Sequence, residues 1–372
     1  MEPDIARQSL PKQGTVYSTT NDEPLTRVEE GAPGGPPLPV VMLRLTTGTW
    51  VSQAISVAAR LGVADVLGRG PRASAEIAAT VDAHGPTLYR LLRALADVGI
   101  LVELRDRRFA LTPLGELLRT DVDGSMRGWA TMIGLPFHRD AWTDLHASVR
   151  TGEPAFARVH GANVFDYLAA HPDDAAVFDA AMTSISTGFV SAIVQAYDFG
   201  RYSTVVDVGG GNGALLAAVL LANPDVRGVL VDRPDVLAGA SAVLERAGVA
   251  DRCHTVAGDF LDELPDSGNL YVLSNILHDW DDDTAVRILR NCLQAISAHG
   301  RLLIVELVLP DGTEPSLAKL LDLEMLAMAP GGRQRTASEY THLLAQAGLR
   351  LTHVVTATPG QAASYVEAAP DI

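Results

Sequence analysis

Residues 207–213, Asp207-Val208-Gly209-Gly210-Gly211-Asn212-Gly213, decide the fold of this chain. They follow the short apolar run 204–208, which is typical of a buried strand, and precede an apolar helical segment near 213–222. Glycines between a strand and a helix let a ligand approach the backbone closely at the start of the helix. Because Gly209, Gly211 and Ala214 also satisfy the dinucleotide fingerprint, the loop predicts a ligand site without naming the ligand.

The pattern around this loop repeats toward the C-terminus. Short apolar runs alternate with helical segments, and the runs are 204–208, 228–232, 253–257, 270–274, 301–305 and one near 350–356. The helical segments lie near 213–222, 234–247 and 282–297, and Thr336 with Glu339 forms a capping box for another helix. This alternation predicts an α/β Rossmann-like domain over residues 199–372, with a doubly wound, mostly parallel sheet. Ligands of such sheets bind at the carboxyl ends of the strands.

The N-terminal half has a different character. Residues 1–40 are rich in proline and glycine and predict a disordered leader, whereas residues 41–198 predict a mostly helical domain. Within residues 74–118, two helices precede a short hairpin whose turn is Arg105–Arg108, which is the order of a winged helix-turn-helix. The formal net charge of −16 disfavours nucleic acid, so we expect this unit to pack against another subunit.

Composition limits the remaining possibilities. A chain of 372 residues suits two domains, and no apolar run is long enough to cross a bilayer. No secretion signal is evident, and Cys253 and Cys292 fit neither a disulfide framework nor a metal clip, so we expect a cytoplasmic protein without membrane attachment. His138, His146 and His160 are not paired with carboxylates at ligand spacing, so no metal site is expected.

Acidic residues follow three of the predicted strands. Asp207 precedes the glycines, Asp232 ends the next strand, and Asp259 with Phe260 follows the third. A carboxylate beside the loop repels a pyrophosphate but attracts an ammonium or a sulfonium centre. Asp232 can accept both hydroxyls of a ribose, while Asp259 and Phe260 suit the amino group and the flat face of adenine. Together these side chains favour S-adenosylmethionine, which carries both cations and no phosphate.

His278 lies at the carboxyl end of the fourth strand, next to the predicted cofactor. A neutral imidazole, which titrates at about pH 6.5 when unperturbed, can accept a proton at physiological pH, so His278 is the candidate base. Glu306 ends the fifth strand, and we expect it to hydrogen-bond the other imidazole nitrogen and to stabilise the imidazolium. Asp281 is expected to cap the following helix.

With these residues in place, the chain resembles the S-adenosylmethionine-dependent O-methyltransferases that include plant caffeate methyltransferases, hydroxyindole O-methyltransferases and bacterial antibiotic-tailoring enzymes. The resemblance spans about residues 41–360, and it is carried most specifically by the runs Leu277–Asp281 and Gly331–Thr336, with support from Arg150–Phe156. It implies a homodimer, formed through a winged helix-turn-helix in an N-terminal helical domain, and a Rossmann-like catalytic domain.

The resemblance also implies roles for single residues. The cofactor contacts that it implies are Gly209, Gly211, Asp232, Asp259, Phe260 and Ser274. His278 matches the general base and Glu306 one of two carboxylates that bracket it. Met182 and Met325 match methionines that enclose an aromatic substrate, and Trp142 is a further candidate for the lining of that site. On the residues alone, the two methionines read as core fillers.

Two positions depart from the plant members of the family. Gln334 stands where they have a glutamate, so the second bracketing carboxylate is absent, and Ser274 stands where they commonly have lysine. Gln334 can hydrogen-bond the imidazole but cannot balance its charge.

We therefore hypothesise that His278 removes the proton of a phenolic hydroxyl as the oxygen attacks the sulfonium methyl group. Three rival functions share parts of the pattern. A dinucleotide-dependent oxidoreductase uses the same glycine loop, and a DNA-binding regulator uses a winged helix. The third rival keeps the fold and the cofactor but methylates carbon or nitrogen, or has lost methyl transfer.

Overall fold

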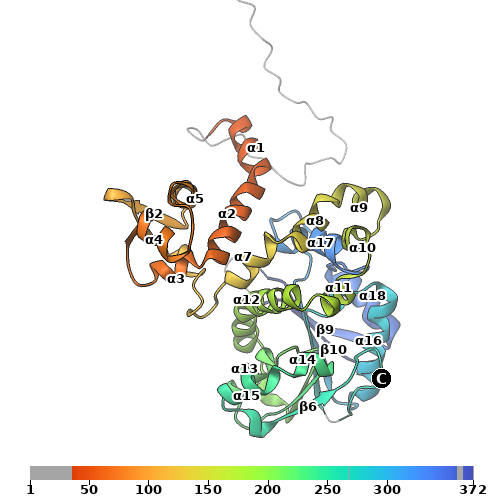
Figure 1. Ribbon diagram of the computed structural model, residues 1–372. Helices are drawn as coiled ribbons and strands as arrows, with labels where there is room; N and C mark the ends of the chain where they lie inside the picture. The colour runs from red at the N-terminus through yellow and green to blue at the C-terminus, as the bar shows by residue number, and fades with distance from the viewer. Residues whose placement is uncertain (1–35, 267, 358–362, 372) are drawn as a thin grey trace, which may run out of the picture.

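The computed structural model describes residues 36–266, 268–357 and 363–371. Residues 1–35, which make up most of the predicted leader, lie outside the described residues, and helix α1 (Leu38–Thr46) begins directly after Pro37. The chain forms an N-terminal group of helices with a small sheet and a larger C-terminal part built on one sheet (Figure 1).

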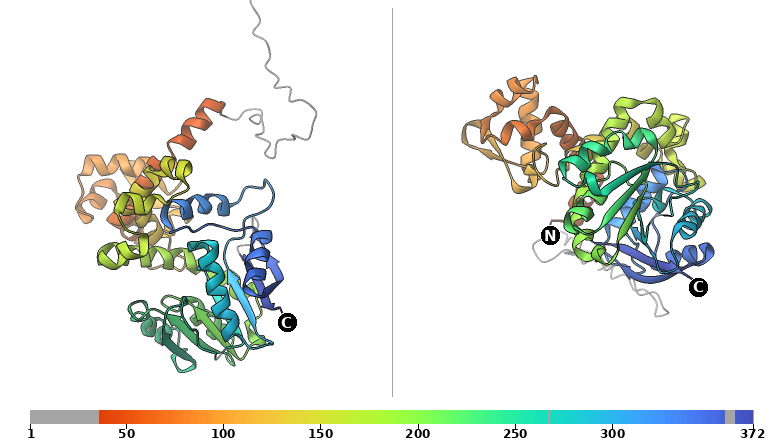
Figure 2. Two further views of the ribbon diagram at one scale, coloured as in Figure 1. Left: turned by 90° about the vertical axis from the view of Figure 1, so that its right-hand side faces the viewer. Right: turned by 90° about the horizontal axis from the view of Figure 1, so that it is seen from below.

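The N-terminal group is held by one apolar core. Its further elements are α2 (Gly48–Leu61), α3 (Val63–Leu67), β1 (Arg72–Ala73), α4 (Ser74–Thr80), α5 (Gly85–Asp97), β2 (Leu101–Leu104), η1 (Arg105–Arg107), β3 (Arg108–Leu111) and α6 (Pro113–Glu116). The three strands pair antiparallel in the order β1-β3-β2. Leu88, Leu92 and Leu95 bury one face of α5 against Ile77 and Phe109, as their helical spacing predicts. Helix α1 extends away from the rest of the chain (Figure 2, left).

Six helices connect this group to the large sheet. They are α7 (Arg127–Ile133), α8 (Pro136–Thr143), α9 (Leu145–Thr151), α10 (Ala155–His160), α11 (Val164–Ala170) and α12 (Pro172–Ala196). Helix α12 packs against α7 on one side and against α13 (Ala214–Ala222) on the other (Figure 1). Among the described residues it alone is long and apolar enough to cross a membrane, which by itself is a weak indication of a span. The expectation that the protein has no membrane partner stays a prediction.

The large sheet has seven strands in the order β6-β5-β4-β7-β8-β10-β9. Their bounds are β4 (Thr204–Val208), β5 (Arg227–Asp232), β6 (Cys253–Ala257), β7 (Leu270–Ser274), β8 (Arg301–Val305), β9 (Leu349–Val355) and β10 (Tyr365–Pro370). The first five in spatial order pair parallel, whereas β10 pairs antiparallel with both β8 and β9. The predicted doubly wound, mostly parallel fold is confirmed. Strand β10 was not among the predicted elements.

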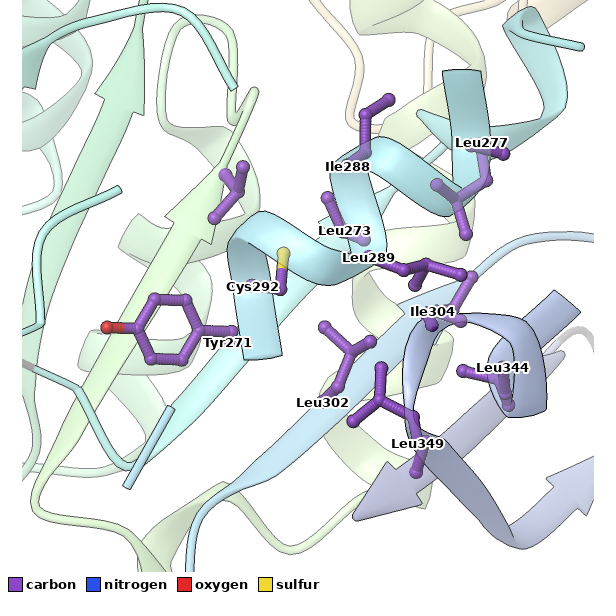
Figure 3. Packing of buried hydrophobic residues seen from close by; sticks show 14 of the residues in the cluster. Tyr271, Leu273, Leu277, Ile288, Leu289, Cys292, Leu302, Ile304, Leu344 and Leu349 are labelled. Carbon is purple, nitrogen blue, oxygen red and sulfur yellow. The ribbon is translucent and has the colours of Figure 1, made fainter. Parts of the chain in front are cut away.

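Helices cover both faces of this sheet. Besides α13, the helical segments of this part of the chain are η2 (Phe199–Arg201), α14 (Pro234–Leu237), α15 (Ala240–Arg246), η3 (Ala250–Arg252), η4 (Leu277–Asp279), α16 (Asp282–Ala295), α17 (Leu317–Met328) and α18 (Ala337–Ala347). Helix α17 packs mainly against α8, α9 and α10. Ile288, Leu289 and Cys292 of α16 meet Leu302 and Ile304 of β8 in the main core (Figure 3). Burying large aliphatic side chains of this kind stabilises the fold by about 1.5–3 kcal/mol each.

Local signals set several helix ends as predicted. Asp281 accepts the backbone N–H of Thr284 at 2.8 Å, so it caps α16. Thr336 and Glu339 form the capping box of α18. Such caps need only a few neighbouring residues, which explains why the sequence reveals them.

Candidate active site

The glycine loop after β4 adopts backbone conformations that residues with a Cβ atom rarely adopt. Gly209, Gly211 and Gly213 have φ angles of 68°, 61° and 79°, in the left-handed region that glycine tolerates. A Cβ on Gly209 would lie 2.6 Å from Cδ1 of Ile276, while a Cβ on Gly211 would meet no heavy atom within 4 Å. The loop therefore has open space above Gly211, as close approach of a ligand requires.

Two carboxylates flank this loop. Asp232 accepts the backbone N–H of Gly211 at 2.7 Å, and burial raises the pKa of its carboxyl group. Asp207 is buried under Gly210, and among the described residues neither of its oxygens has a hydrogen-bond partner. Burial, and secondarily the charge of Asp232, raises the pKa of Asp207 to about 7. An unpartnered buried carboxylate suits a cationic ligand nearby and is a poor neighbour for a pyrophosphate.

The other predicted cofactor residues lie at the same end of the sheet. Asp259 and Phe260 follow β6, and Ser274 is the last residue of β7. Asp259 is exposed and binds the backbone N–H of Leu261, whereas the Phe260 ring meets Trp280 edge-on, with 6.0 Å between ring centroids. The parallel register of β4, β5, β6 and β7 brings these strand ends together, as the sequence predicts.

His278 lies on the one-turn helix η4 and is largely buried. Its Nδ1 is 3.3 Å from Nε2 of Gln334, and its Nε2 is 3.6 Å from a carboxylate oxygen of Asp279. Gln334 is itself buried. The imidazole therefore has a neutral amide as its neighbour at the position where the plant enzymes have a charged carboxylate. An amide offers both a donor and an acceptor, so Gln334 can pair with either tautomer of His278, whereas a carboxylate would select the Nδ1–H form.

The structure corrects the expectation for Glu306. Its Oε1 accepts the backbone N–H groups of Ile276, Leu277 and His278 at 3.0, 2.7 and 3.2 Å, and its Oε2 accepts the hydroxyl of Tyr340. The prediction that Glu306 hydrogen-bonds the imidazole is therefore wrong. The carboxylate binds the backbone instead, because three consecutive N–H groups of the turn converge on it.

Arg335 holds the other side of the same turn. It is fully buried and donates to the carbonyl oxygens of Leu277 and Trp280, both at 2.8 Å, and to Asp282. The backbone that carries His278 is thus held through its N–H groups by Glu306 and through its carbonyls by Arg335. Our reading of the sequence did not assign this role to Arg335 or Tyr340. The specific run Gly331–Thr336 contained the signal for Arg335.

The predicted acceptor residues come from three helices. Met182 lies on α12, Met325 on α17 and Trp142 on α8, and all three are partly buried. Met182 and Trp142 pack at the edge of one apolar cluster with Phe165 of α11. The Phe165 ring stacks on Trp280, with 6.0 Å between centroids, and Trp280 lies two residues beyond His278. Aromatic side chains therefore connect this cluster to the turn of His278.

The residues present fit S-adenosylmethionine. The open glycine loop, the unpartnered carboxylate of Asp207, the strand-end Asp232 and the aromatic Phe260 provide a backbone cradle, negative charge and a flat apolar face. No group of three or more potential metal-ligating side chains occurs among the residues that the structure describes. Fold and site together define a methyltransferase that uses S-adenosylmethionine.

Family models place the chain more narrowly. The O-methyltransferase domain matches residues 142–350, and the O-methyltransferase dimerisation domain matches residues 43–121. The chain belongs to this O-methyltransferase family.

Three relatives cover most of the chain. This chain is 45% identical over 342 residues to phenazine O-methyltransferase of Lysobacter antibioticus, and the match covers 92% of this chain and 99% of that protein. It is 42% identical over 334 residues to O-demethylpuromycin-O-methyltransferase of Streptomyces alboniger, covering 88% of each. It is 39% identical over 308 residues to 8-amino-8-demethylriboflavin N,N-dimethyltransferase of Streptomyces davaonensis, covering 82% and 88%.

Solved structures agree with the fold. An O-methyltransferase from neocarzinostatin biosynthesis, solved with S-adenosylmethionine and 2-hydroxy-5-methyl naphthoic acid, superposes with a TM-score of 0.72 at 36% identity, covering 86% of this chain and 96% of that one. Human N-acetylserotonin methyltransferase, solved with S-adenosylmethionine, superposes with a TM-score of 0.82 at 25% identity, covering 92% and 100%.

Proposed function

We propose that this protein methylates a phenolic hydroxyl of an aromatic secondary metabolite or its precursor, with His278 as the general base. One observation carries the proposal. The turn that bears His278 is held on both sides by buried side chains, Glu306 and Arg335, beside the strand ends that form the cofactor site. Such support fixes the direction of a side chain, which a proton transfer requires.

The residues divide the work as follows. S-adenosylmethionine supplies the methyl group. Its contacts in this proposal are Gly209, Gly211, Asp232, Asp259, Phe260 and Ser274. His278 accepts the proton of the acceptor hydroxyl, which in an ordinary phenol has a pKa of about 10. A positioned base of this kind contributes about 10²–10⁴-fold to the rate.

The acceptor ring lies between Met182 and Met325 in this proposal, with Trp142 beside it. Thioethers are polarizable and pack well against aromatic rings, which supports the assignment. Several relatives carry names that describe aromatic acceptors, and the neocarzinostatin enzyme was solved with a naphthoic acid.

Nitrogen methylation is the second candidate, because Gln334 contacts His278 where the plant enzymes have a carboxylate. A neutral amide does not balance the charge of an imidazolium, and an aromatic amine needs less help from a base than a phenol does. One relative is named an N,N-dimethyltransferase. Transfer to carbon, or loss of transfer, would likewise leave the cofactor residues unchanged.

Assembly follows the same division of the chain. We assign residues 41–198 to a helical dimerisation domain and residues 199–372 to the catalytic domain, working as a cytoplasmic homodimer without nucleic acid. Large apolar side chains of α1 and α2 are exposed, among them Met42, Leu43, Leu45 and Trp50, with Leu45 and Trp50 at 72% and 71%. A second copy that covers them would remove this area from water.

The test uses His278→Ala with methyl-labelled cofactor and a panel of polycyclic phenols and aminophenols. The variant should bind the cofactor as the parent does but lose about 10²–10⁴-fold of the methyl transfer rate. His342→Ala, at an exposed histidine of α18, is the matched control and should keep the parental rate. Transfer at the parental rate by His278→Ala would contradict the base role, and product masses with fragmentation distinguish oxygen from nitrogen.

A further inference from the structure

A polar group of three side chains lies between α8 and α17, outside the turn of His278. Nε2 of His138 is 2.8 Å from Oε1 of Glu324, and the indole N–H of Trp142 donates to Oε2. His138 and Glu324 are buried, with 2% and 8% of their surfaces exposed. Their surroundings are apolar, because the cluster around α8 consists of aliphatic, aromatic and methionine side chains.

The hydrogen bonds fix the tautomer of His138. The carboxylate of Glu324 accepts a hydrogen bond from the indole at one oxygen and faces the imidazole with the other. An ionised carboxylate can only accept, so Nε2 of His138 carries a hydrogen. In the neutral ring, Nδ1 then carries a lone pair. Nδ1 is buried, and no described residue hydrogen-bonds it. Leaving a buried polar atom unpaired is unfavourable, so Nδ1 is suited to accept a hydrogen bond from a molecule that binds beside it.

The position of the group connects it to the acceptor. Trp142 follows His138 by one turn of α8, and Met325 is adjacent to Glu324 on α17. Both residues line the site of the methyl acceptor in the proposed function, on which this inference rests. Met182 and Phe165 pack on the same cluster, and Phe165 continues to Trp280.

We infer that His138, held by Glu324 and Trp142, is a specificity-determining residue that binds a hydrogen-bond donor on the acceptor ring, an amino or a second hydroxyl group, remote from the methylated atom. The lone pair of Nδ1 accepts that hydrogen. A carboxylate on the acceptor is disfavoured at this position, because it offers no hydrogen and approaches the negative charge of Glu324.

Glu324→Gln gives a sharp test, because the indole of Trp142 can only donate. The new amide must turn its oxygen toward Trp142 and its NH₂ toward His138. Nε2 of His138 then accepts, and its hydrogen moves to Nδ1, which becomes a donor. The variant should therefore reverse the preference of the site from donor-bearing rings to acceptor-bearing rings.

The experiment measures binding by calorimetry to the dimer saturated with S-adenosylhomocysteine. The probes are dihydroxynaphthalene isomers, the two naphthols, and 6-hydroxy-2-naphthoate. In the parent, at least one diol should bind about tenfold more tightly than either naphthol and than the hydroxynaphthoate. In Glu324→Gln the hydroxynaphthoate should bind more tightly than that diol, and in His138→Phe the diol should lose its advantage. His160→Phe, which alters another histidine of the same helical region, should keep the parental order.

Several results would overturn the inference. They are absence of binding, equal binding of diol and naphthols to the parent, or an unchanged order in Glu324→Gln. An unchanged order in Glu324→Gln would mean that a structural water, and not the methyl acceptor, hydrogen-bonds Nδ1. If His138→Phe does not fold, the isosteric Glu324→Gln still decides. The proposed function fails separately, when the diol preference holds but no methylated product forms from any probe.

Discussion

Glu306→Gln tests whether Glu306 supports the turn of His278 or the charge of its imidazole. Glutamine has nearly the shape of glutamate, so the substitution removes charge and leaves volume. Its amide oxygen can still accept the N–H groups of Ile276, Leu277 and His278, and its NH₂ can donate to the hydroxyl of Tyr340. The turn should therefore form, but with weaker hydrogen bonds.

The magnitude follows from the three backbone contacts at 2.7–3.2 Å. Hydrogen bonds to a charged group are about twice as strong as neutral ones, roughly 1.5–3 against 0.5–1.5 kcal/mol, so each contact loses about 1 kcal/mol. Part of the loss is offset because a neutral amide is less costly to bury than a carboxylate. We expect the free energy of unfolding to fall by about 2–3 kcal/mol and Tm by roughly 3–4 °C.

The assay combines thermal unfolding with the pH dependence of kcat/KM. If Glu306 only positions the turn, the variant should have lower stability and lower kcat. The pH at which kcat/KM falls on the acidic side should then be the same as in the parent. Tyr340→Phe should act in the same direction, since it leaves Oε2 of Glu306 buried without a donor, at a cost of about 1–3 kcal/mol. Burial and the charge of Glu306 raise the pKa of Tyr340 well above its ordinary value, so its hydroxyl stays a donor throughout the assay.

Glu263→Gln, at an exposed glutamate, is the matched control and should change stability by less than about 0.5 kcal/mol. The reasoning is refuted if Glu306→Gln is as stable as the parent and moves the acidic limb. That result would mean that Glu306 acts on the imidazole charge directly, as the family resemblance implied.

Three further predictions concern other parts of the molecule. Burial raises the pKa of Asp207 from 3.8 to about 7, so the cofactor-free protein loses stability as the pH rises between these values. Asp207→Asn should therefore have a higher Tm than the parent at pH 8 and the same Tm near pH 4. Equal Tm values of variant and parent at both pH values would contradict this. Gly209→Ala places a Cβ 2.6 Å from Ile276 at a backbone φ of 68°. Calorimetry should therefore show that the affinity for the cofactor falls about tenfold or more. An unchanged affinity would show that the loop tolerates a side chain. Replacing both Leu45 and Trp50 by glutamate should convert the dimer to monomers in light scattering, and an unchanged mass would exclude this surface as the interface.

Parts of the fold and site were predictable from the sequence because they depend on neighbouring residues. The strands 204–208, 270–274 and 301–305 match the structure at both ends, since continuous apolar runs mark strands buried on both faces. The bounds of 253–257 also match, but this strand lies at the edge of the sheet and is partly exposed. The cap of α16 at Asp281 likewise needs only a hydrogen bond across three residues. Strand β10 was missed because it pairs antiparallel between β8 and β9, which no pattern within 365–370 reveals.

The sequence by itself determined the parallel part of the sheet, the glycine loop with its strand-end carboxylates, and the place of His278 at the end of a strand, because parallel topology brings consecutive strand ends together. Only the tertiary structure decided what each functional side chain contacts. Glu306 meets the backbone of residues 276–278 rather than an imidazole, and Glu324 meets a histidine 186 positions away. These partners depend on how distant helices pack against the sheet, and hydrogen bonds change partner over shifts of about 1 Å that no local pattern encodes.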